Sequence, residues 1–192
     1  EPGYLGTISE LPALINKAHA NSIPVIIDAA WGAHFGFNPN IPQHVMQLGA
    51  DALITSVHKA LPGYSASALL LANGTLLNLD RIEQSFETTH TTSPAGAPLA
   101  SIDACRALLQ TRGDELTGQL LNNVKAFKTS VQSNFSENIF LNPEQFPANR
   151  FDPVKIVLRA NVLGLSGVDV EKQLQKANIL SLIHISEPTR RY

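Results

Sequence analysis

Residues 23–28 read Ile23-Pro24-Val25-Ile26-Ile27-Asp28, a continuous apolar run that ends in a carboxylate. A short apolar run without polar alternation is typical of a parallel strand that is buried on both faces. Ligands of parallel α/β sheets bind beyond the carboxyl ends of the strands, so we expect Asp28 to face a crevice. A carboxylate in such a place is costly unless it is paired, which favours a cationic partner. Taken alone, Asp28 could equally be a helix cap or a turn residue.

On either side of this run, the chain alternates short apolar segments with amphipathic ones. Further strands are expected at residues 52–55 and 67–72, and helices at residues 8–20, 41–48, 76–86, 98–110 and 115–135. Gly49 is expected to end the second of these helices. Strands that alternate with helices predict an α/β fold with a mostly parallel sheet in about the first 115 residues.

A second, smaller unit is expected after a polar stretch that contains two prolines, residues 136–149. A strand at 154–159, a turn at 163–167 and a helix at 168–177 would give it an α+β character. The expected division is therefore a partial large domain at residues 1–135 and the start of a small domain at residues 150–180. Residues 181–192 do not extend the preceding helix pattern, and we expect them to be a non-native tail.

Composition excludes several classes of protein. Of the 192 residues, 44% are hydrophobic and 16% are charged, which predicts a buried core and argues against disorder. A formal net charge of −2 without a basic stripe makes nucleic acid an unsuitable partner. No apolar run approaches the roughly 18 residues that cross a bilayer, and no signal peptide is visible. The lone Cys105 cannot form an internal disulfide, which favours a reducing compartment and hence the cytoplasm.

A second segment, Ser56-Val57-His58-Lys59, follows the next expected strand. A lysine with a hydroxyl and an imidazole beside it has the composition of a Schiff-base lysine next to a phosphate site. Pyridoxal phosphate (PLP) requires an amine, a phosphate cradle and an acid at its ring nitrogen, and Asp28 could supply that acid. On less specific interpretations, Lys59 is a surface lysine and His58 a capping or core histidine. His34 could equally be structural.

Several strings, in order along the chain, resemble one known family. The string Asp28-Ala29-Ala30-Trp31-Gly32-Ala33-His34-Phe35-Gly36-Phe37 resembles the Asp-x-Ala-His/Trp-Gly-Ala-His segment of the basic-amino-acid decarboxylases. These are the ornithine, lysine and arginine (Orn/Lys/Arg) decarboxylases of the aspartate-aminotransferase fold. Six further segments resemble the same family, in the same order along the chain: residues 49–51, 56–62, 91–94, 99–103, 152–155 and 164–167. The resemblance extends to about Ile179, and it implies a fold-type-I large domain.

The resemblance also implies roles for individual residues. Lys59 would form the internal aldimine with PLP, Asp28 would pair with the pyridine nitrogen, and His58 would lie near the reacting atoms. The cofactor-binding set implied in this way is Asp28, Ala30, Trp31, Ser56, His58, Lys59, Thr92 and Ser93. Either of the last two would reach the cofactor phosphate of a neighbouring subunit, which implies a homodimer or a higher homo-oligomer with shared sites.

The implied reaction is decarboxylation of lysine, ornithine or arginine to the corresponding polyamine-pathway amine. Two departures from the family leave the identity of the substrate open. Trp31 stands where many relatives have histidine, and residues 63–67 replace a glutamine-containing stretch. The family's phosphate turn and its ring-stacking histidine would lie upstream of Glu1. Two alternatives follow: a different fold-type-I PLP enzyme, such as an aminotransferase or a desulfurase, or a fragment with no independent activity.

Overall fold

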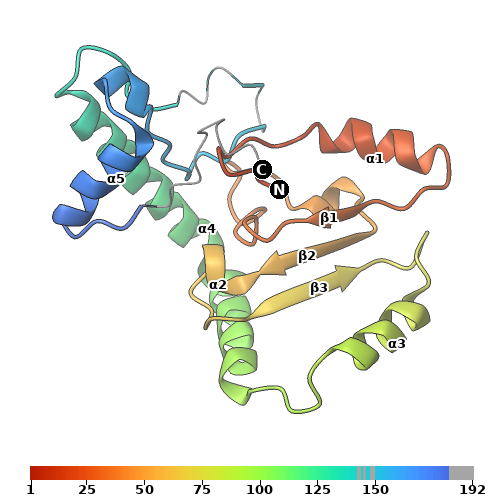
Figure 1. The fold of residues 1–192 in the computed structure, drawn as a ribbon. Coiled ribbons are helices and arrows are strands. Elements are labelled where there is room, and N and C mark those ends of the chain that lie inside the picture. Colours follow the sequence, from red (N-terminus) through yellow and green to blue (C-terminus); the bar gives the residue numbers. More distant parts are fainter. Residues whose placement is uncertain (142–143, 145, 148–149, 182–192) are drawn as a thin grey trace.

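A three-stranded sheet lies at the centre of the protein (Figure 1). The computed structural model describes residues 1–141, 144, 146–147 and 150–181. Strand β1 (Ile26–Asp28) pairs in parallel with β2 (Ala52–Ser56), and β2 pairs in antiparallel with β3 (Ala68–Ala72). All three strands were expected, although β1 is shorter than the apolar run that predicted it.

The expectation of a mostly parallel sheet is only partly met, because β3 runs against β2. A parallel return needs a crossover of a dozen or more residues, usually with a helix long enough to span the sheet. Residues 57–67 contain only the single-turn helix α2 (Val57–Ala60), so the chain turns back at the same edge. The structure is nevertheless of the mixed α/β class.

One face of the sheet is covered by a small hydrophobic core. Helix α1 (Leu11–His19) and the 3₁₀ helix η1 (Val45–Leu48) pack there. The buried cluster consists of Ile8, Leu11, Ile15, Ile27, Ala29, Phe35, Val45, Ala50 and Leu53. Helix α1 and η1 are both shorter than expected, and Gly49 ends η1 as expected, in a left-handed conformation with φ of 98°.

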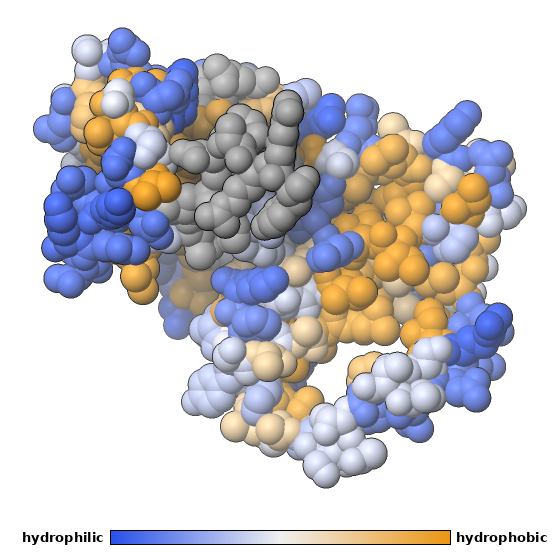
Figure 2. All heavy atoms as spheres, viewed as in Figure 1, coloured by the Kyte–Doolittle hydropathy of each residue, from blue (hydrophilic) through white to orange (hydrophobic). Residues whose placement is uncertain are grey.

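The opposite face of the sheet is open. Ile26, Ile54 and Leu70 lie side by side on it and are 59%, 46% and 42% exposed. Figure 2 shows a broad hydrophobic area over this part of the molecule. Side chains alternate between the faces of a strand, so Asp28, two residues after Ile26, belongs to the same open face.

Helix α3 (Leu79–Thr89) and the long helix α4 (Gly96–Gln132) follow the sheet. Two helices were expected where α4 is continuous. The expected gap between residues 110 and 115 contains Gly113, and this glycine lies at a helix contact: a Cβ atom there would be 2.8 Å from Phe37 Cδ1. Asn38 Nδ2 donates to Asp114 Oδ1 at 2.7 Å beside it, so α4 is held against the loop after β1.

The C-terminal part differs from the expected α+β pattern. In place of a strand at 154–159 there is an isolated antiparallel bridge between Phe140 and Leu158. A short 3₁₀ helix, η3 (Ala160–Leu163), and α5 (Gly167–Lys176) follow, and α5 begins with a capping box of Ser166 and Asp169. The expected tail at 181–192 lies outside the described residues, apart from residue 181. None of the helices in the described parts is long and apolar enough to cross a membrane.

Candidate active site

The two segments singled out in the sequence meet at one edge of the sheet. Asp28 ends β1 and Ser56 ends β2, and these strands are parallel neighbours. The Ala29 N–H donates to Ile54 O at 2.7 Å, and the Thr55 hydroxyl donates to Ala29 O at 2.8 Å. These bonds fix the chain after Asp28 against the chain before α2. Asp28, Ala30 and Ser56 are thus brought together, and Lys59 lies within the turn of helix that begins directly after Ser56.

Asp28 is exposed, and its carboxylate is oriented by its own backbone. Oδ1 accepts the N–H of Ala30 at 3.0 Å, the arrangement of an Asx turn. The main-chain oxygen of Asp28 accepts from the amino group of Glu1. The carboxylate therefore has a defined direction at the open face of the sheet without being neutralised by a cation among the described residues.

Ser56 and His58 differ in how they are held. Ser56 is the N-cap residue of α2, but its side chain makes no capping hydrogen bond. His58 Nδ1 lies 2.7 Å from the carbonyl oxygen of Ser67, so Nδ1 carries the proton. Only Nε2 then remains for a ligand, and it donates a hydrogen bond only when the ring is an imidazolium. The sequence alone gave no indication of this tautomer.

Ser67 is a residue that the sequence analysis missed as part of the site. It is 2% exposed, and its carbonyl accepts from both Val57 N–H, at 3.0 Å, and His58. Its hydroxyl has no hydrogen-bond partner within the described part of the chain. Gly63 permits this close packing, because a Cβ there would lie 2.7 Å from Val57 Cγ1 and 2.8 Å from Ser67 Oγ. The run of small residues around Ser67 is the signal that could have indicated such a tight turn.

Lys59 and the two residues expected to serve a neighbouring subunit are all exposed. Thr92 and Ser93 lie in the loop between α3 and α4, where the Ser93 N–H donates to Thr91 Oγ1 at 3.3 Å. No hydrogen bond or ion pair among the described residues joins either one to Asp28, Ser56 or Lys59.

Trp31 and His34 extend from the same loop toward the C-terminal segment. The Trp31 and Tyr4 rings are nearly perpendicular, with centroids 5.5 Å apart, and Lys155 Nζ lies 3.7 Å from the centroid of the Trp31 ring. His34 is 6% exposed and its Nε2 lies 3.2 Å from Asp152 Oδ1, a carboxylate with no exposure. This partner favours the structural interpretation of His34.

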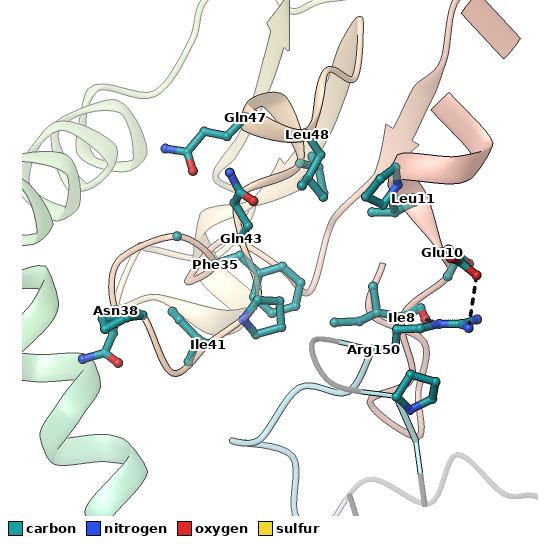
Figure 3. A pocket seen from close by; sticks show the side chains of 17 residues that line it. Ile8, Glu10, Leu11, Phe35, Asn38, Ile41, Gln43, Gln47, Leu48 and Arg150 are labelled. Atoms are coloured by element: carbon teal, nitrogen blue, oxygen red, sulfur yellow. Dashed lines mark hydrogen bonds and ion pairs between the residues drawn. The ribbon is translucent and has the colours of Figure 1, made fainter. Parts of the chain in front are cut away.

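A groove lies elsewhere on the molecule (Figure 3). It has a volume of about 700 Å³ between α1, the chain around η1 and Arg150, which pairs with Glu10 at 3.6 Å. None of the candidate cofactor residues lines it. The candidate site is instead an open sheet edge. The described residues contain no group of three or more acidic, histidine or cysteine side chains that could hold a metal ion.

The donor set at the sheet edge fits PLP in chemical type. It offers a carboxylate for a ring nitrogen, an amine, a hydroxyl and the small side chain of Ala30 beside them. The acid and the lysine thus lie beyond the carboxyl ends of adjacent parallel strands, where ligands of α/β sheets bind.

Comparison with known families agrees with a site of this kind. The family model for the Orn/Lys/Arg decarboxylase major domain matches residues 1–148. The chain therefore belongs to the Orn/Lys/Arg decarboxylase family, whose members are PLP-dependent decarboxylases.

Curated relatives carry related names. Arginine decarboxylase of Bacillus subtilis (strain 168) is 33% identical over 92% of this chain, and arginine decarboxylase of Halalkalibacterium halodurans is 30% identical over 91%. The uncharacterized protein YaaO of Bacillus subtilis (strain 168) is 31% identical over 94% of this chain. The chain spans only 36%, 36% and 37% of the lengths of these three proteins.

A solved structure was also found, a complex of SepCysS with the SepCysE N-terminal domain. It aligns with a TM-score of 0.48 at 15% identity, over 69% of this chain and 35% of that one. This likeness is too weak to define the fold.

Proposed function

We propose that the chain carries the lysine-bearing part of a PLP-dependent decarboxylase that acts on a basic amino acid. The observation that carries the proposal is the convergence of Asp28 with Ser56 and Lys59 at one edge of a parallel strand pair. Membership of the decarboxylase family supports the reaction. Relatives named arginine decarboxylases make arginine the first substrate to test, with lysine and ornithine next.

Each residue has a role that its position supports. When bound, PLP supplies an electron sink for the pair released as the carboxylate leaves as CO2. Asp28 would hold a proton at the ring nitrogen, a stabilisation that grows as charge develops in the transition state. Lys59 Nζ would bind the cofactor covalently, and the Ser56 hydroxyl would donate to its phosphate. His58, whose Nδ1 is held by the Ser67 carbonyl oxygen, would present Nε2 to the reacting atoms. The Cα then takes one proton, so amino acid plus H⁺ gives amine plus CO2.

The subunit arrangement is a separate part of the proposal. Thr92 and Ser93 lie on an exposed loop between α3 and α4, where a second copy of the chain could reach them. A homodimer with shared sites would use them in this way. Sedimentation of the protein, with and without PLP, measures whether a dimer forms. Ser93→Ala should weaken PLP binding only in the dimeric state.

Covalent capture tests the cofactor role of Lys59. The protein is incubated with PLP and reduced with borohydride, and the labelled peptide is identified by mass spectrometry. Lys59 should carry the label, and Lys59→Ala should lose both the label and the visible absorbance. Lys17→Ala, an exposed lysine of α1, is the matched control. A label that persists in Lys59→Ala would contradict the assignment.

Product analysis separates the reaction classes. Release of labelled CO2 from carboxyl-labelled arginine, lysine or ornithine supports the decarboxylase. A keto acid product would favour an aminotransferase, which also uses an acid and a lysine of this kind.

A further inference from the structure

Lys155 lies close to the candidate site, although it is far from it in sequence. Its Nζ is 3.7 Å from the centroid of the Trp31 ring, a cation–π contact. Trp31 directly follows Ala30, whose N–H is bound by the Asp28 carboxylate. The contact therefore joins the C-terminal segment to the turn that orients Asp28.

The aliphatic part of the Lys155 side chain, between its backbone and the Trp31 ring, is packed against Gly6. Gly6 has φ of +85°, and a Cβ atom there would lie 3.0 Å from both Cβ and Cγ of Lys155. The Lys155 N–H donates to Asp152 O at 3.1 Å, and its carbonyl accepts from Lys128 Nζ at 3.0 Å. A lysine confined in this way has already lost much of its rotamer entropy, so holding the ring costs little more.

Charge also favours this arrangement. The carboxylate of Asp152 is fully buried and attracts both Lys128 and Lys155. Burial lowers the pKa of each ammonium, and the charge of Asp152 opposes that change. Asp152 also pairs with His34, three residues after Trp31. The same loop is therefore bound at two points by the segment that contains Asp152 and Lys155.

We propose that Lys155 is a positioning residue for the cofactor site: by holding Trp31, it fixes the turn from Asp28 to Gly32. The catalytic importance of Lys155 rests on the proposed function. The contact by which Lys155 restrains Trp31 does not itself require cofactor. The turn is closed by the Gly32 N–H to Ala29 O bond at 2.8 Å and by the bond from Ala30 N–H to Asp28 Oδ1. Lys155 touches neither Asp28 nor Lys59 by any hydrogen bond or ion pair in the described residues, so it would act through Trp31.

The test uses three variants of the whole chain. Lys155→Met keeps the apolar stem and removes the charge. Lys155→Arg keeps a cation that can lie over the indole. Lys125→Met, an exposed position of α4, is the matched control.

Two readouts do not depend on cofactor. Trp31 is the only tryptophan of the chain, so acrylamide quenching of the protein's tryptophan fluorescence reports on it alone. Hydrogen exchange at the Ala30 and Gly32 amides reports on the turn. Lys155→Met should raise both the quenching constant and the two exchange rates about fivefold, whereas Lys155→Arg and Lys125→Met should resemble the wild type. Unchanged quenching and exchange in Lys155→Met would overturn the proposal.

A third readout connects the restraint to the cofactor. Energy transfer from Trp31 to bound PLP gives the dissociation constant, which should rise about fivefold in Lys155→Met and be restored in Lys155→Arg. An unchanged constant, despite a loosened turn, would overturn the positioning role. PLP that fails to bind the wild type would instead contradict the proposed function, and the quenching and exchange measurements would still decide whether Lys155 holds Trp31. Retention of far-ultraviolet circular dichroism shows that each variant is folded.

Discussion

Asp28 is the residue whose charge the proposed chemistry needs most. Asp28→Asn keeps an oxygen that can accept from Ala30 N–H, but it cannot keep a ring nitrogen protonated. We expect kcat to fall by about two powers of ten or more, by analogy with other lost electrostatic contributions, while some PLP is still bound. Steady-state assays of CO2 release measure this, with Asp80→Asn on α3 as the control. Turnover near that of the control would contradict the role of Asp28.

Asp51 is important to stability rather than to chemistry. It is 2% exposed, and its Oδ2 accepts from Val25 N–H at 2.7 Å and lies 2.8 Å from His19 Nε2. Burial acts to raise the pKa of Asp51, but these hydrogen bonds and the His19 charge outweigh it, so the pKa lies below 3.8. Asp51→Asn should therefore cost about 1–3 kcal/mol of unfolding free energy at neutral pH.

The pH dependence of Asp51 has a definite sign. Because the pKa is lower in the folded state, the carboxylate's contribution is complete above the unfolded value and is lost as the pH falls through the folded one. The stability difference between wild type and Asp51→Asn should shrink on acidification below the usual value of 3.8. Urea titrations at several pH values measure it. Asp103→Asn, in an exposed pair with Arg106, should show only a small difference throughout.

Sequence could locate the chemical residues of the site but not their hydrogen bonds. The apolar run before Asp28 and the strand before Ser56 were enough to place both at one sheet edge, because parallel neighbours share that edge. The tautomer of His58 depends on the Ser67 carbonyl, which reaches it only because β3 turns back on β2. The contact between Trp31 and Lys155 joins residues from opposite ends of the chain, and no local pattern predicts it.

At the scale of elements, the sheet and α4 show where local patterns fail. The strand pattern of β3 was recognised, but its direction is set by the length of the connection rather than by its own residues. The expected gap between residues 110 and 115 is helical in the structure, and Gly113 within it makes a close contact with Phe37. A helix interior tolerates such a glycine when a neighbouring side chain occupies the space of its Cβ.

Helix α4 offers a paired test of that interpretation. Gly113→Ala would place a Cβ 2.8 Å from Phe37 Cδ1 and 3.3 Å from Phe37 Cβ, so the strain should exceed the gain in helix propensity. We expect a net loss of roughly 1–2 kcal/mol. Gly118→Ala meets only Asn38 Nδ2 at 3.6 Å and should gain up to about 1 kcal/mol. Thermal unfolding of both variants measures this, and equal effects would show that Phe37 does not restrain α4.

At the scale of the whole molecule, the open face of the sheet is the most unusual feature. Ile26, Ile54 and Leu70 form one apolar surface between strands β1 and β3, each of which has a single pairing partner among the described residues. The Asp28 side chain lies on the same face of the sheet. The chain spans 36% of the length of the Bacillus subtilis arginine decarboxylase that it matches.

This open face predicts how the chain behaves in solution. Contiguous apolar surface beside unpaired strand edges favours association with dyes and with other chains. The 192-residue chain should bind a hydrophobic dye and sediment with a concentration-dependent mass, and Ile54→Lys should reduce both effects severalfold by placing a charge at the centre of the surface. Leu14→Lys, on the exposed side of α1, is the matched control because Leu14 is 55% exposed but remote from the sheet face. If Ile54→Lys and Leu14→Lys behave alike, association does not occur through the sheet face.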